Sequence, residues 1–375
     1  MDFQLSPEHR LLQDTARRVA EQVKWDAVVE VGYPYDFARS LAASGLTGIA
    51  MATEDGGQGA SLADAVIVME AVTAVHPRAG DVVQATNFGA IRQIAELAGP
   101  SARERYLRPV LAGNAVPSVA ITEPESGSAV AEMRTTARID GAEVVVQGSK
   151  IFNTHGPYAD HYVVWARFAE GPDGIGAVIV PSTAPGFSRG ATEHYLSGEP
   201  HCALYFDACR VPVENVLADQ GGLRRLLPIF NVERLGNAAR SLACGERAFH
   251  EAVTHTRTRH QFGHPLADNQ GLRWRFADLR MRLDAARLLL YRAASAPDGL
   301  PDGTESAIAK LACNTVGFDA VNEAIQMHGA LGLSDQSVLP YLLGRTRGWM
   351  IAGGSVEMMR NGIAQKVLGR VTTRG

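Results

Sequence analysis

The sequence has no long apolar run, no excess of basic residues and no apolar leader. Its 375 residues are 46 % hydrophobic and 20 % charged, and the formal net charge is −4 at pH 7. A helix needs about 20 consecutive apolar residues to cross a bilayer, and no segment offers them. The acidic balance argues against attraction to nucleic acid or to an anionic membrane surface. We therefore expect a globular, cytoplasmic protein whose partners include neither a membrane nor nucleic acid.

Short motifs that would identify a nucleotide site, a nucleophile or a metal site are also missing. There is no G-x-G-x-x-G after a strand pattern, no P-loop and no G-x-S-x-G. Without an H-E-x-x-H pair, the clustered histidines predict no metal site. These histidines are His250, His255, His260 and His264. The cysteines form no C-x-x-C pair, and we expect them to be buried and reduced. They are Cys202, Cys209, Cys244 and Cys313.

Hydrophobic periodicity divides the chain into three parts. Apolar residues recur at helical spacing to about residue 133, then in short runs rich in Val, Ile, Tyr and Phe to about residue 217, and again at helical spacing from Gly222. Asp140-Gly141, between two of the short runs, is a hairpin signal. We predict an α+β fold with an N-terminal all-α domain (1–115), a middle antiparallel β-barrel-like domain (116–222) and a C-terminal four-helix bundle (223–375).

Individual helices can be predicted in both helical parts. In the N-terminal part we expect them over residues 11–23, 37–46, 62–72 and 91–97, with a glycine-rich loop at 52–59. In the C-terminal part we expect a helix from Asn231 as N-cap, after Pro228 ends the preceding element. Further helices are expected over 272–290, 306–327 and 355–368. Arg257 and Arg259, at the end of the helix that follows Asn231, could bind a flat anionic ligand. The default interpretation of these two arginines is a solvated basic turn.

Seven stretches resemble, in order along the chain, motifs of the acyl-CoA dehydrogenase superfamily of flavoproteins. They are 120–128 (AITEPESGS), 148–154 (GSKIFNT), 206–212 (FDACRVP), 233–235 (ERL), 259–263 (RHQFG) with Gln270, 325–330 (IQMHGA) and 354–355 (GS). The resemblance covers nearly the whole chain and implies the acyl-CoA dehydrogenase fold. It also implies an FAD-dependent enzyme that oxidises a CH–CH bond.

The resemblance implies that FAD is bound non-covalently and without a Rossmann fingerprint. Ile121 and Thr122 would offer backbone groups to the isoalloxazine edge, and the Ser128 hydroxyl would reach the pyrophosphate. Phe152 would lie against the flavin, and Thr154 would hydrogen bond near its N5.

By the same resemblance, part of the site would come from a neighbouring subunit. The residues that would reach the neighbour's FAD are Arg259, Phe262, Gln270, Gln326 and Gly329. Ser355 and Glu357 would lie near the AMP half of the cofactor. Such sharing makes a homodimer the smallest competent unit, and the family pattern is a homotetramer built as a dimer of dimers.

The family's catalytic base is missing from its usual place. In many members a glutamate precedes the Gly-Thr pair of the C-terminal motif, but here Gly353 precedes Gly354-Ser355, which leaves only a backbone N–H. A minority branch takes its base from the helix that opens the C-terminal domain, at the position of Glu233. The competing interpretation is a helix-start acid stabilised by the helix dipole. Arg234 is expected to shape the thioester pocket, or to form a structural ion pair.

Other departures from the family motifs suggest a divergent member, acting in a specialised biosynthetic pathway. The departures are Thr53, Ala129, His155 and Gly344-Arg345. The first hypothesis is α,β-dehydrogenation of an acyl-CoA or acyl-carrier-protein thioester, with Glu233 as base and a flavoprotein or O₂ as electron acceptor. The second is a flavin oxygenase or oxidase that uses O₂, suggested by His155 beside the flavin. The third is a non-enzymatic flavin-binding scaffold.

Overall fold

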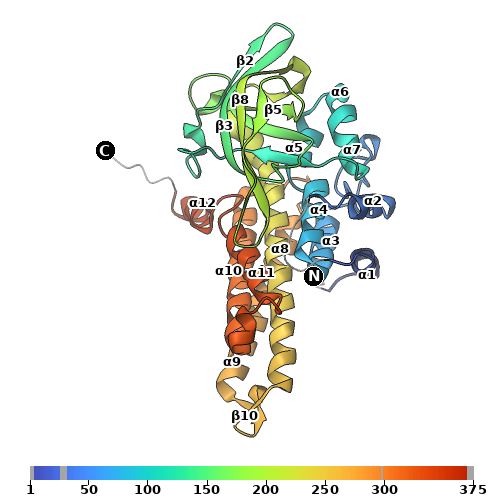
Figure 1. Ribbon diagram of the computed structural model, residues 1–375, viewed down its shortest axis with the longest axis vertical. Helices are drawn as coiled ribbons and strands as arrows, with labels where there is room; N and C mark the ends of the chain where they lie inside the picture. The colour runs from blue at the N-terminus through green and yellow to red at the C-terminus, as the bar shows by residue number, and fades with distance from the viewer. Residues whose placement is uncertain (1–3, 26–31, 297–298, 370–375) are drawn as a thin grey trace, which may run out of the picture. The chain divides into compact units, whose positions relative to one another are not determined.

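The computed structural model describes residues 4–25, 32–296 and 299–369 (Figure 1). The chain folds into two compact units, each built from segments that are separated in the sequence. We name them the sheet unit (residues 29–65 and 81–233) and the bundle unit (residues 1–28, 66–80 and 234–375).

Among the described residues of the sheet unit, nine strands form one sheet. The strands are β1 (Pro117–Ala120), β2 (Thr136–Asp140), β3 (Glu143–Thr154), β4 (His161–Arg167), β5 (Ile175–Pro181), β6 (Phe187–Arg189), β7 (Glu193–His194), β8 (Pro200–Pro212) and β9 (Val216–Ala218). Their order is β6-β8-β3-β2-β4-β5-β9, with β1 beside β4 and β7 beside β8. The predicted hairpin joins β2 to β3, and Gly141 in its turn has a φ of 65°, which glycine adopts without strain.

The prediction of an antiparallel, barrel-like domain is correct for the helix–sheet–helix order but wrong for the strand directions. β1 and β2 both run parallel to β4, so the sheet is mixed, and its path does not close among the described residues. Apolar patterning has the same period in parallel and antiparallel strands, so the sequence carried no signal for direction. β4 and β5 are buried at nearly every position, as expected for strands covered on both faces.

Helices and short turns precede the strands of this sheet or connect them along the chain. The helices are α2 (Tyr35–Ala43), α5 (Ala90–Leu97), α6 (Pro100–Ala102) and α7 (Arg108–Leu111), with a π-turn η2 (Arg103–Leu107) and 3₁₀ turns η1 (Thr53–Asp55), η3 (Val130–Glu132), η4 (Pro172–Gly174) and η5 (Val213–Asn215). The apolar face of α5, with Ile91 and Ile94, packs with Trp165 of β4 in one core. Trp165 Nε1 also donates to Gln93 Oε1 at 2.8 Å, so the buried indole is satisfied.

Long helices form the bundle unit. They are α1 (Pro7–Glu21), α9 (Gln270–Ala294), α10 (Gly303–His328), α11 (Leu339–Trp349) and α12 (Val356–Leu368), with β10 (His260–Gln261), β11 (His264–Pro265), η6 (Leu266–Asp268) and η7 (Gly329–Leu333). Three helices carry residues of both units: α3 (Leu62–Val75), α4 (Pro77–Asn87) and α8 (Gly222–Thr258). α10 packs against α9, α11 and α12, while the β10–β11 hairpin follows the end of α8 (Figure 1).

The predicted helices are present, but two details of the C-terminal part are wrong. α8 begins at Gly222 and contains Pro228, so Asn231 is not an N-cap and Pro228 does not end a preceding element. Proline removes only one helical hydrogen bond, and a 37-residue helix can retain it. α11 was not anticipated, so among its described residues the C-terminal part contains α8, α9, α10, α11 and α12 rather than four helices.

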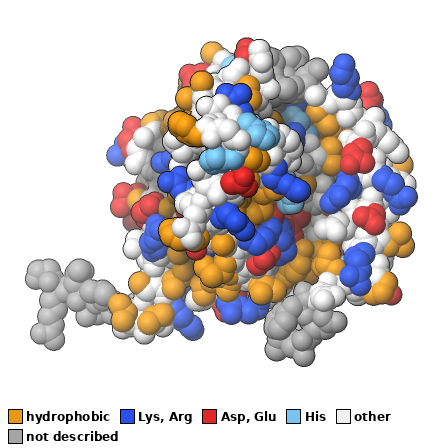
Figure 2. All heavy atoms as spheres, turned by 90° about the horizontal axis from the view of Figure 1, so that it is seen from below, with side chains coloured by type: hydrophobic (Ala, Val, Ile, Leu, Met, Phe, Trp, Pro, Cys, Tyr) orange, Lys and Arg blue, Asp and Glu red, His pale blue; other side chains and the backbone are white. Residues whose placement is uncertain are grey.

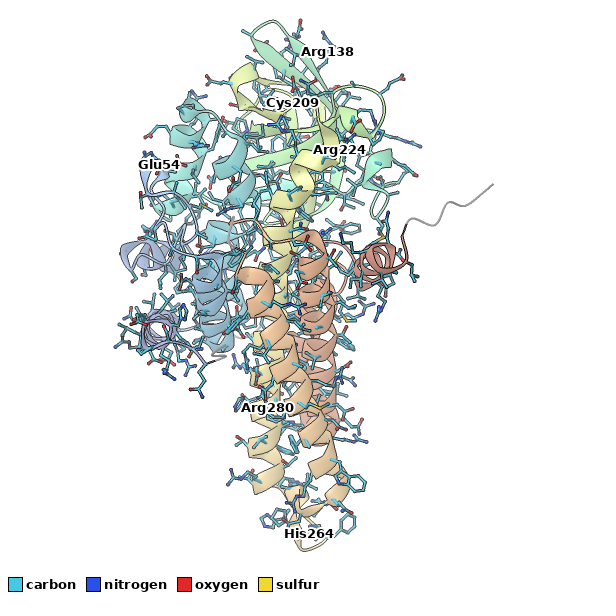
Figure 3. The ribbon with its side chains drawn as sticks, turned by 180° about the vertical axis from the view of Figure 1, so that it is seen from behind. Glu54, Arg138, Cys209, Arg224, His264 and Arg280 are labelled. Carbon is cyan, nitrogen blue, oxygen red and sulfur yellow. The ribbon has the colours of Figure 1, made fainter. Side chains whose placement is uncertain are left out.

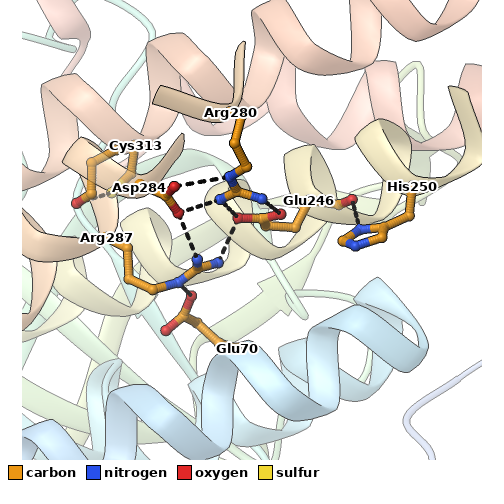
Figure 4. A network of polar contacts seen from close by, with 8 residues as sticks. Glu70, Glu246, His250, Arg280, Asp284, Arg287 and Cys313 are labelled. Atoms are coloured by element: carbon orange, nitrogen blue, oxygen red, sulfur yellow. Dashed lines mark hydrogen bonds and ion pairs between the residues drawn. The ribbon is translucent and has the colours of Figure 1, made fainter. Parts of the chain in front are cut away.

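An ion-pair network ties three helices of the bundle unit together (Figure 4). The carboxylate of Glu246 on α8 accepts from Arg280 and Arg287 on α9, at 2.6 and 2.7 Å. Arg287 Nε also donates to Glu70 on α3 at 3.1 Å. Burial raises the pKa of Glu246, but the hydrogen bonds and charges of the two arginines lower it overall. Because these carboxylates are mostly shielded from water, the network fixes the relative positions of α3, α8 and α9.

The remaining composition-based expectations can be checked on the residues that the structure describes. All four cysteines are free and buried, as predicted. Across residues 4–25, 32–296 and 299–369, no helix combines the length and apolarity needed to cross a bilayer.

Candidate active site

The end of β3 presents an aromatic ring from a strained backbone. Phe152 has a φ of 57°, and its side chain is 55 % exposed. The β3–β8 register shifts between Lys150 and Asn153, and such a bulge turns a side chain out of the sheet. Asn153 Nδ2 donates to Cys202 O at 3.0 Å, and Ser118 Oγ donates to Thr154 O at 2.6 Å. Strain at an exposed aromatic that is so firmly anchored is typical of a binding site.

The loop that contains Ile121 and Thr122 is held beside β3 by a buried ion pair. Lys150 Nζ lies 2.8 Å from Glu123 Oε1 and donates to Ile121 O at 2.9 Å, with the lysine side chain fully buried. Burial lowers the pKa of Lys150 to about 8, although Glu123 opposes the shift. Ile151 N donates to Thr122 O at 2.9 Å, which aligns the loop with the strand.

The Glu123 carboxylate also anchors the backbone that leads into β2. It accepts from Arg134 N at 2.5 Å and from Thr135 N at 2.9 Å. Burial raises its pKa, but the hydrogen bonds from Arg134 N and Lys150 lower it overall. Further along the same loop Ser128 is exposed. The structure thus places Ile121, Thr122, Phe152 and Thr154, all predicted site residues, on two adjoining backbone segments.

These segments fit an FAD isoalloxazine ring chemically. The Thr122 N–H donates to no acceptor among the described residues, so it is available to a ligand carbonyl. Phe152 supplies an exposed flat surface and Thr154 a hydroxyl from the same short stretch. The combination of an apolar surface and a few convergent polar groups is what a flavin requires.

The predicted neighbour-reaching residues lie at one end of the bundle unit. Phe262 is 96 % exposed with a φ of 53° in the β10–β11 turn, and Gln270 begins α9. Figure 3 labels His264 in the same hairpin, and Figure 2 views the molecule from this side, where His, Lys and Arg side chains are exposed together. His255 and His328 stack with ring centroids 4.1 Å apart, which joins the ends of α8 and α10.

A different region of the bundle unit contains the predicted AMP-side residues and the position of the usual base. Ser355 N-caps α12 by accepting from Met358 N at 3.4 Å, and Glu357 lies in its first turn. Its own backbone N–H and the Ser355 hydroxyl lower the pKa of Glu357. Figure 1 places α12 far along the bundle from the β10–β11 hairpin. The predicted cofactor residues of the bundle unit therefore form two separate sets.

The turn at Gly353 is tightly packed, and a side chain there would require Asn237 to shift. Gly353 and Gly354 have φ of 73° and 91°. A Cβ on Gly353 would lie 2.7 Å from Asn237 Nδ2 and 3.4 Å from Lys310 Cε. Arg234 Nε donates to Gly353 O at 3.1 Å, which fixes the peptide, while the Gly353 N–H donates to no acceptor among the described residues.

Glu233 lies in the interior of α8, about three turns after Gly222. The prediction that it stands in the first turn is therefore wrong, and stabilisation by the helix dipole does not explain it. Its side chain is half-buried, and its backbone carbonyl accepts from Gln84 Nε2 at 3.5 Å. A half-buried carboxylate without a capping role is a candidate for chemistry.

Several residues of these sites were not predicted. Asn237 and Lys310 adjoin Gly353 from α8 and α10 and carried no motif. Lys150 belongs to the stretch GSKIFNT, but its buried ion pair with Glu123 joins residues that are 27 positions apart in the sequence. The sequence signal for this ion pair was a lysine within an otherwise strand-like stretch, because a lysine is seldom buried without a partner.

Sequence models of the acyl-CoA dehydrogenase N-terminal, middle and C-terminal domains match residues 6–114, 118–209 and 220–368. The chain belongs to the acyl-CoA dehydrogenase family. It is 32 % identical to 3-sulfinopropanoyl-CoA desulfinase of Paraburkholderia xenovorans, over 98 % of both chains. It is 30 % identical to the short-chain specific acyl-CoA dehydrogenase of Clostridium acetobutylicum, over 98 % of this chain and all of the other.

Solved structures agree with this assignment. Butyryl-CoA dehydrogenase from Megasphaera elsdenii superimposes with a TM-score of 0.90 at 26 % identity, covering 98 % of this chain and 100 % of that chain. The predicted superfamily and fold are confirmed. As a member of the acyl-CoA dehydrogenase family, the protein is a flavin-dependent oxidoreductase that acts on CH–CH bonds, and its cofactor is FAD.

Proposed function

We propose that this acyl-CoA dehydrogenase desaturates the α,β bond of an acyl thioester, on CoA or on a carrier protein, with Glu233 as the base. Two separate observations support the proposal: position 353 carries no side chain that could act as a base, and Glu233 is a half-buried carboxylate on another element. A member of the family that has lost one base and kept the fold needs a carboxylate from another element. The unusual Ala129 and His155 fit a specialised biosynthetic pathway rather than routine fatty-acid oxidation.

The reaction makes two demands on the protein's own groups. The α-proton must pass to a carboxylate, which is the proposed role of Glu233. The thioester oxygen must receive hydrogen bonds as enolate charge develops on it, and the unengaged Gly353 N–H is suited to that task. Arg234 positions this peptide through its bond to Gly353 O.

FAD, when bound, would supply the acceptor for the β-hydrogen, which leaves the substrate as hydride. Ile121, Thr122, Phe152 and Thr154 would hold the isoalloxazine, with Ser128 toward the pyrophosphate. The residues of the bundle unit that would serve FAD are Arg259, Phe262, Gln270, Gln326, Gly329, Ser355 and Glu357. Since the bundle-unit residues fall into two separated sets, we propose that one set serves a neighbouring subunit, in a homodimer or homotetramer.

The test is Glu233→Gln, which keeps the shape of the side chain and removes the base. FAD content should be unchanged, while the rate of flavin reduction by a reactive acyl-CoA falls roughly 10²- to 10⁴-fold. Glu251→Gln is the matched control, because Glu251 is an exposed glutamate of the same helix and should leave the rate unchanged. Unchanged reduction by the Glu233 variant would remove this residue from the mechanism. Oxygen uptake in the same assay shows whether O₂, rather than a flavoprotein, accepts the electrons of the reduced FAD.

A second candidate follows from the relatives named 3-sulfinopropanoyl-CoA desulfinase. A substrate with a leaving group on its acyl chain would not need a glutamate at position 353, which agrees with the crowded turn there. Incubation with 3-sulfinopropanoyl-CoA and measurement of sulfite distinguishes the two functions. Sulfite release that survives Glu233→Gln supports the second candidate, and release of an enoyl product supports the first.

A further inference from the structure

Helix α11 ends in a buried tryptophan that contacts two guanidinium groups. Trp349 is the last residue of the helix, and its side chain is buried. The guanidinium of Arg240 on α8 lies over its ring, 4.9 Å from the centroid, and that of Arg345 on α11 lies over it at 4.9 Å as well. Cation–π attraction is strongest for tryptophan and for cations shielded from water, and both arginines are buried. The ring is therefore held by side chains from two helices of the bundle unit.

The main-chain carbonyl of Trp349 is held by a third helix. Lys310 Nζ donates to Trp349 O at 2.9 Å, and Asn314 Nδ2 donates to the same oxygen at 2.5 Å. Lys310 and Asn314 are both fully buried and lie four residues apart on α10, so they share one face of that helix. The ring and the carbonyl of Trp349 are thus held by separate groups. A substitution that changes only the ring therefore leaves both donors to the carbonyl in place.

The turn that follows Trp349 carries the Gly353 N–H. Met350 directly follows the tryptophan, and Val356 N donates across the turn to Met350 O at 3.0 Å. The turn is therefore closed on itself and continuous with the end of α11. Its tip contains two successive glycines, the residue type with the most backbone freedom. The direction of the Gly353 N–H must then be set by the groups that hold the turn.

One side of α8 contacts this turn at both its base and its tip. Arg234, Asn237 and Arg240 follow one another at intervals of three residues, which places them on the same side of the helix. At the tip, Arg234 Nε donates to Gly353 O at 3.1 Å. At the base, Arg240 lies over the Trp349 ring, and it also donates to Asn237 Oδ1 at 2.6 Å. Arg240 thus links the tryptophan ring to the amide that lies beside Gly353.

We propose that Trp349 is a positioning residue, whose contacts with Arg240 and Arg345 direct the Gly353 N–H at the thioester oxygen of the substrate. The inference rests on the proposed role of that N–H as a donor to the developing enolate. Such a donor stabilises charge only when its distance and direction match the oxygen, so a turn that moves loses the effect. The inference also gives a role to Arg345, one of the departures from the family motifs.

The direct measurement is the carbonyl stretching frequency of crotonyl-CoA that carries a heavy carbon isotope at its carbonyl. The probe is bound to the FAD-loaded protein, and isotope-edited infrared difference spectra isolate its C=O band. A hydrogen bond to the thioester oxygen weakens the C=O bond, so the band of the bound probe should lie below that of the free probe. Trp349→Phe keeps a smaller ring and should lose part of this shift. Trp349→Leu, which keeps no ring, should lose more.

The kinetics should follow the same order. Flavin reduction by a reactive acyl-CoA should slow by roughly 10- to 100-fold in Trp349→Leu, and by less in Trp349→Phe, with little change in the dissociation constant of the acyl-CoA. Trp274→Phe is the matched control, because Trp274 is an exposed tryptophan of α9, and it should keep the wild-type band and rate. A purely structural role of Trp349 would lower the unfolding temperature but leave the band and the rate unchanged.

The outcomes separate this inference from the function on which it rests. Should Trp349→Leu fail to fold, Trp349→Phe alone decides, since its smaller ring still fills much of the site. A full band shift and an unchanged rate in the folded Trp349 variants would overturn the inference and leave the proposed function standing. If the wild-type protein itself leaves the carbonyl band at its solution frequency, the Gly353 N–H does not meet the thioester. Its proposed role then fails together with the inference.

Discussion

Asn237 stands where a side chain at position 353 would have to go: its Nδ2 would lie 2.7 Å from a Cβ on Gly353. Arg240 donates to Asn237 Oδ1 at 2.6 Å, so the amide is held in place from the other side. In the bundle unit, Asn237 thus occupies the space that the family's glutamate side chain would need. A glutamate introduced at position 353 alone therefore does not restore the usual catalytic site.

The first prediction concerns Gly353→Glu. The new side chain must displace Asn237 and adopt a φ of 73°, which for a non-glycine residue costs about 1 to 3 kcal/mol. We expect a lower unfolding temperature and no gain in dehydrogenation. Gly271→Ala is the control, since nothing lies within 4 Å of its Cβ, and it should be neutral or stabilising. A Gly353→Glu enzyme that is stable and faster than the wild type would show that the turn can accept a base.

The second prediction concerns the buried pair of Lys150 and Glu123. Glu123→Gln leaves the Lys150 charge buried without its counter-ion, which should cost about 3 to 5 kcal/mol in the free energy of unfolding. The pKa of Glu123 lies below its ordinary value of 4.5, so its stabilisation is present above pH 4.5 and is lost as the pH falls further. Urea denaturation at pH 3 to 7 should therefore show a shallower acid slope for the variant. Equal slopes would mean that the pair does not contribute.

The third prediction concerns His161, a buried residue of β4. Burial lowers its pKa from 6.5 to about 4, although Asp160 opposes the shift. The unfolded chain binds this proton more readily, so stability is lost as the pH falls from 6.5 to 4, by up to about 3 kcal/mol. His161→Phe keeps a ring beside Tyr106 and removes the titration, so its stability should depend less on pH in that range. The exposed His194, changed to Gln, serves as the comparison and should preserve the wild-type slope.

The sequence was sufficient for elements whose signal is local. The apolar spacing over residues 11–23 predicted a helix, and α1 is present there; Ser6 Oγ caps its start by accepting from His9 N at 3.2 Å. It was insufficient where a contact joins distant segments. Gly353 showed that a base was missing, but only the fold shows that Asn237 fills its place. Likewise Pro228 normally interrupts a helix, yet packing along α8 retains it, which moved Glu233 from a helix start to a helix interior.

The fourth prediction concerns the sharing of one FAD site between two chains. Phe262 is almost fully exposed at the β10–β11 turn, and the hairpin lies far along the bundle from α12. We therefore predict that residues of this end reach the cofactor of a second chain, while Ser355 serves the cofactor of its own chain. Arg259→Glu in one chain should abolish binding of the FAD held mainly by the neighbouring chain. Ser128→Asp should abolish binding of the FAD held by the same chain, because the new carboxylate repels the pyrophosphate.

Mixing the two defects distinguishes sharing from a site within one chain. The variants are co-expressed with different affinity tags, and the mixed assembly is purified through both tags. If Arg259 serves the neighbour's FAD, each mixed dimer contains one site with both defects and one intact site, so yellow colour and FAD absorbance should return although each parent is colourless. If both residues serve the same chain, every site keeps one defect and the mixed assembly stays colourless. Returned colour thus requires that Arg259 and Ser128 of different chains meet at one cofactor.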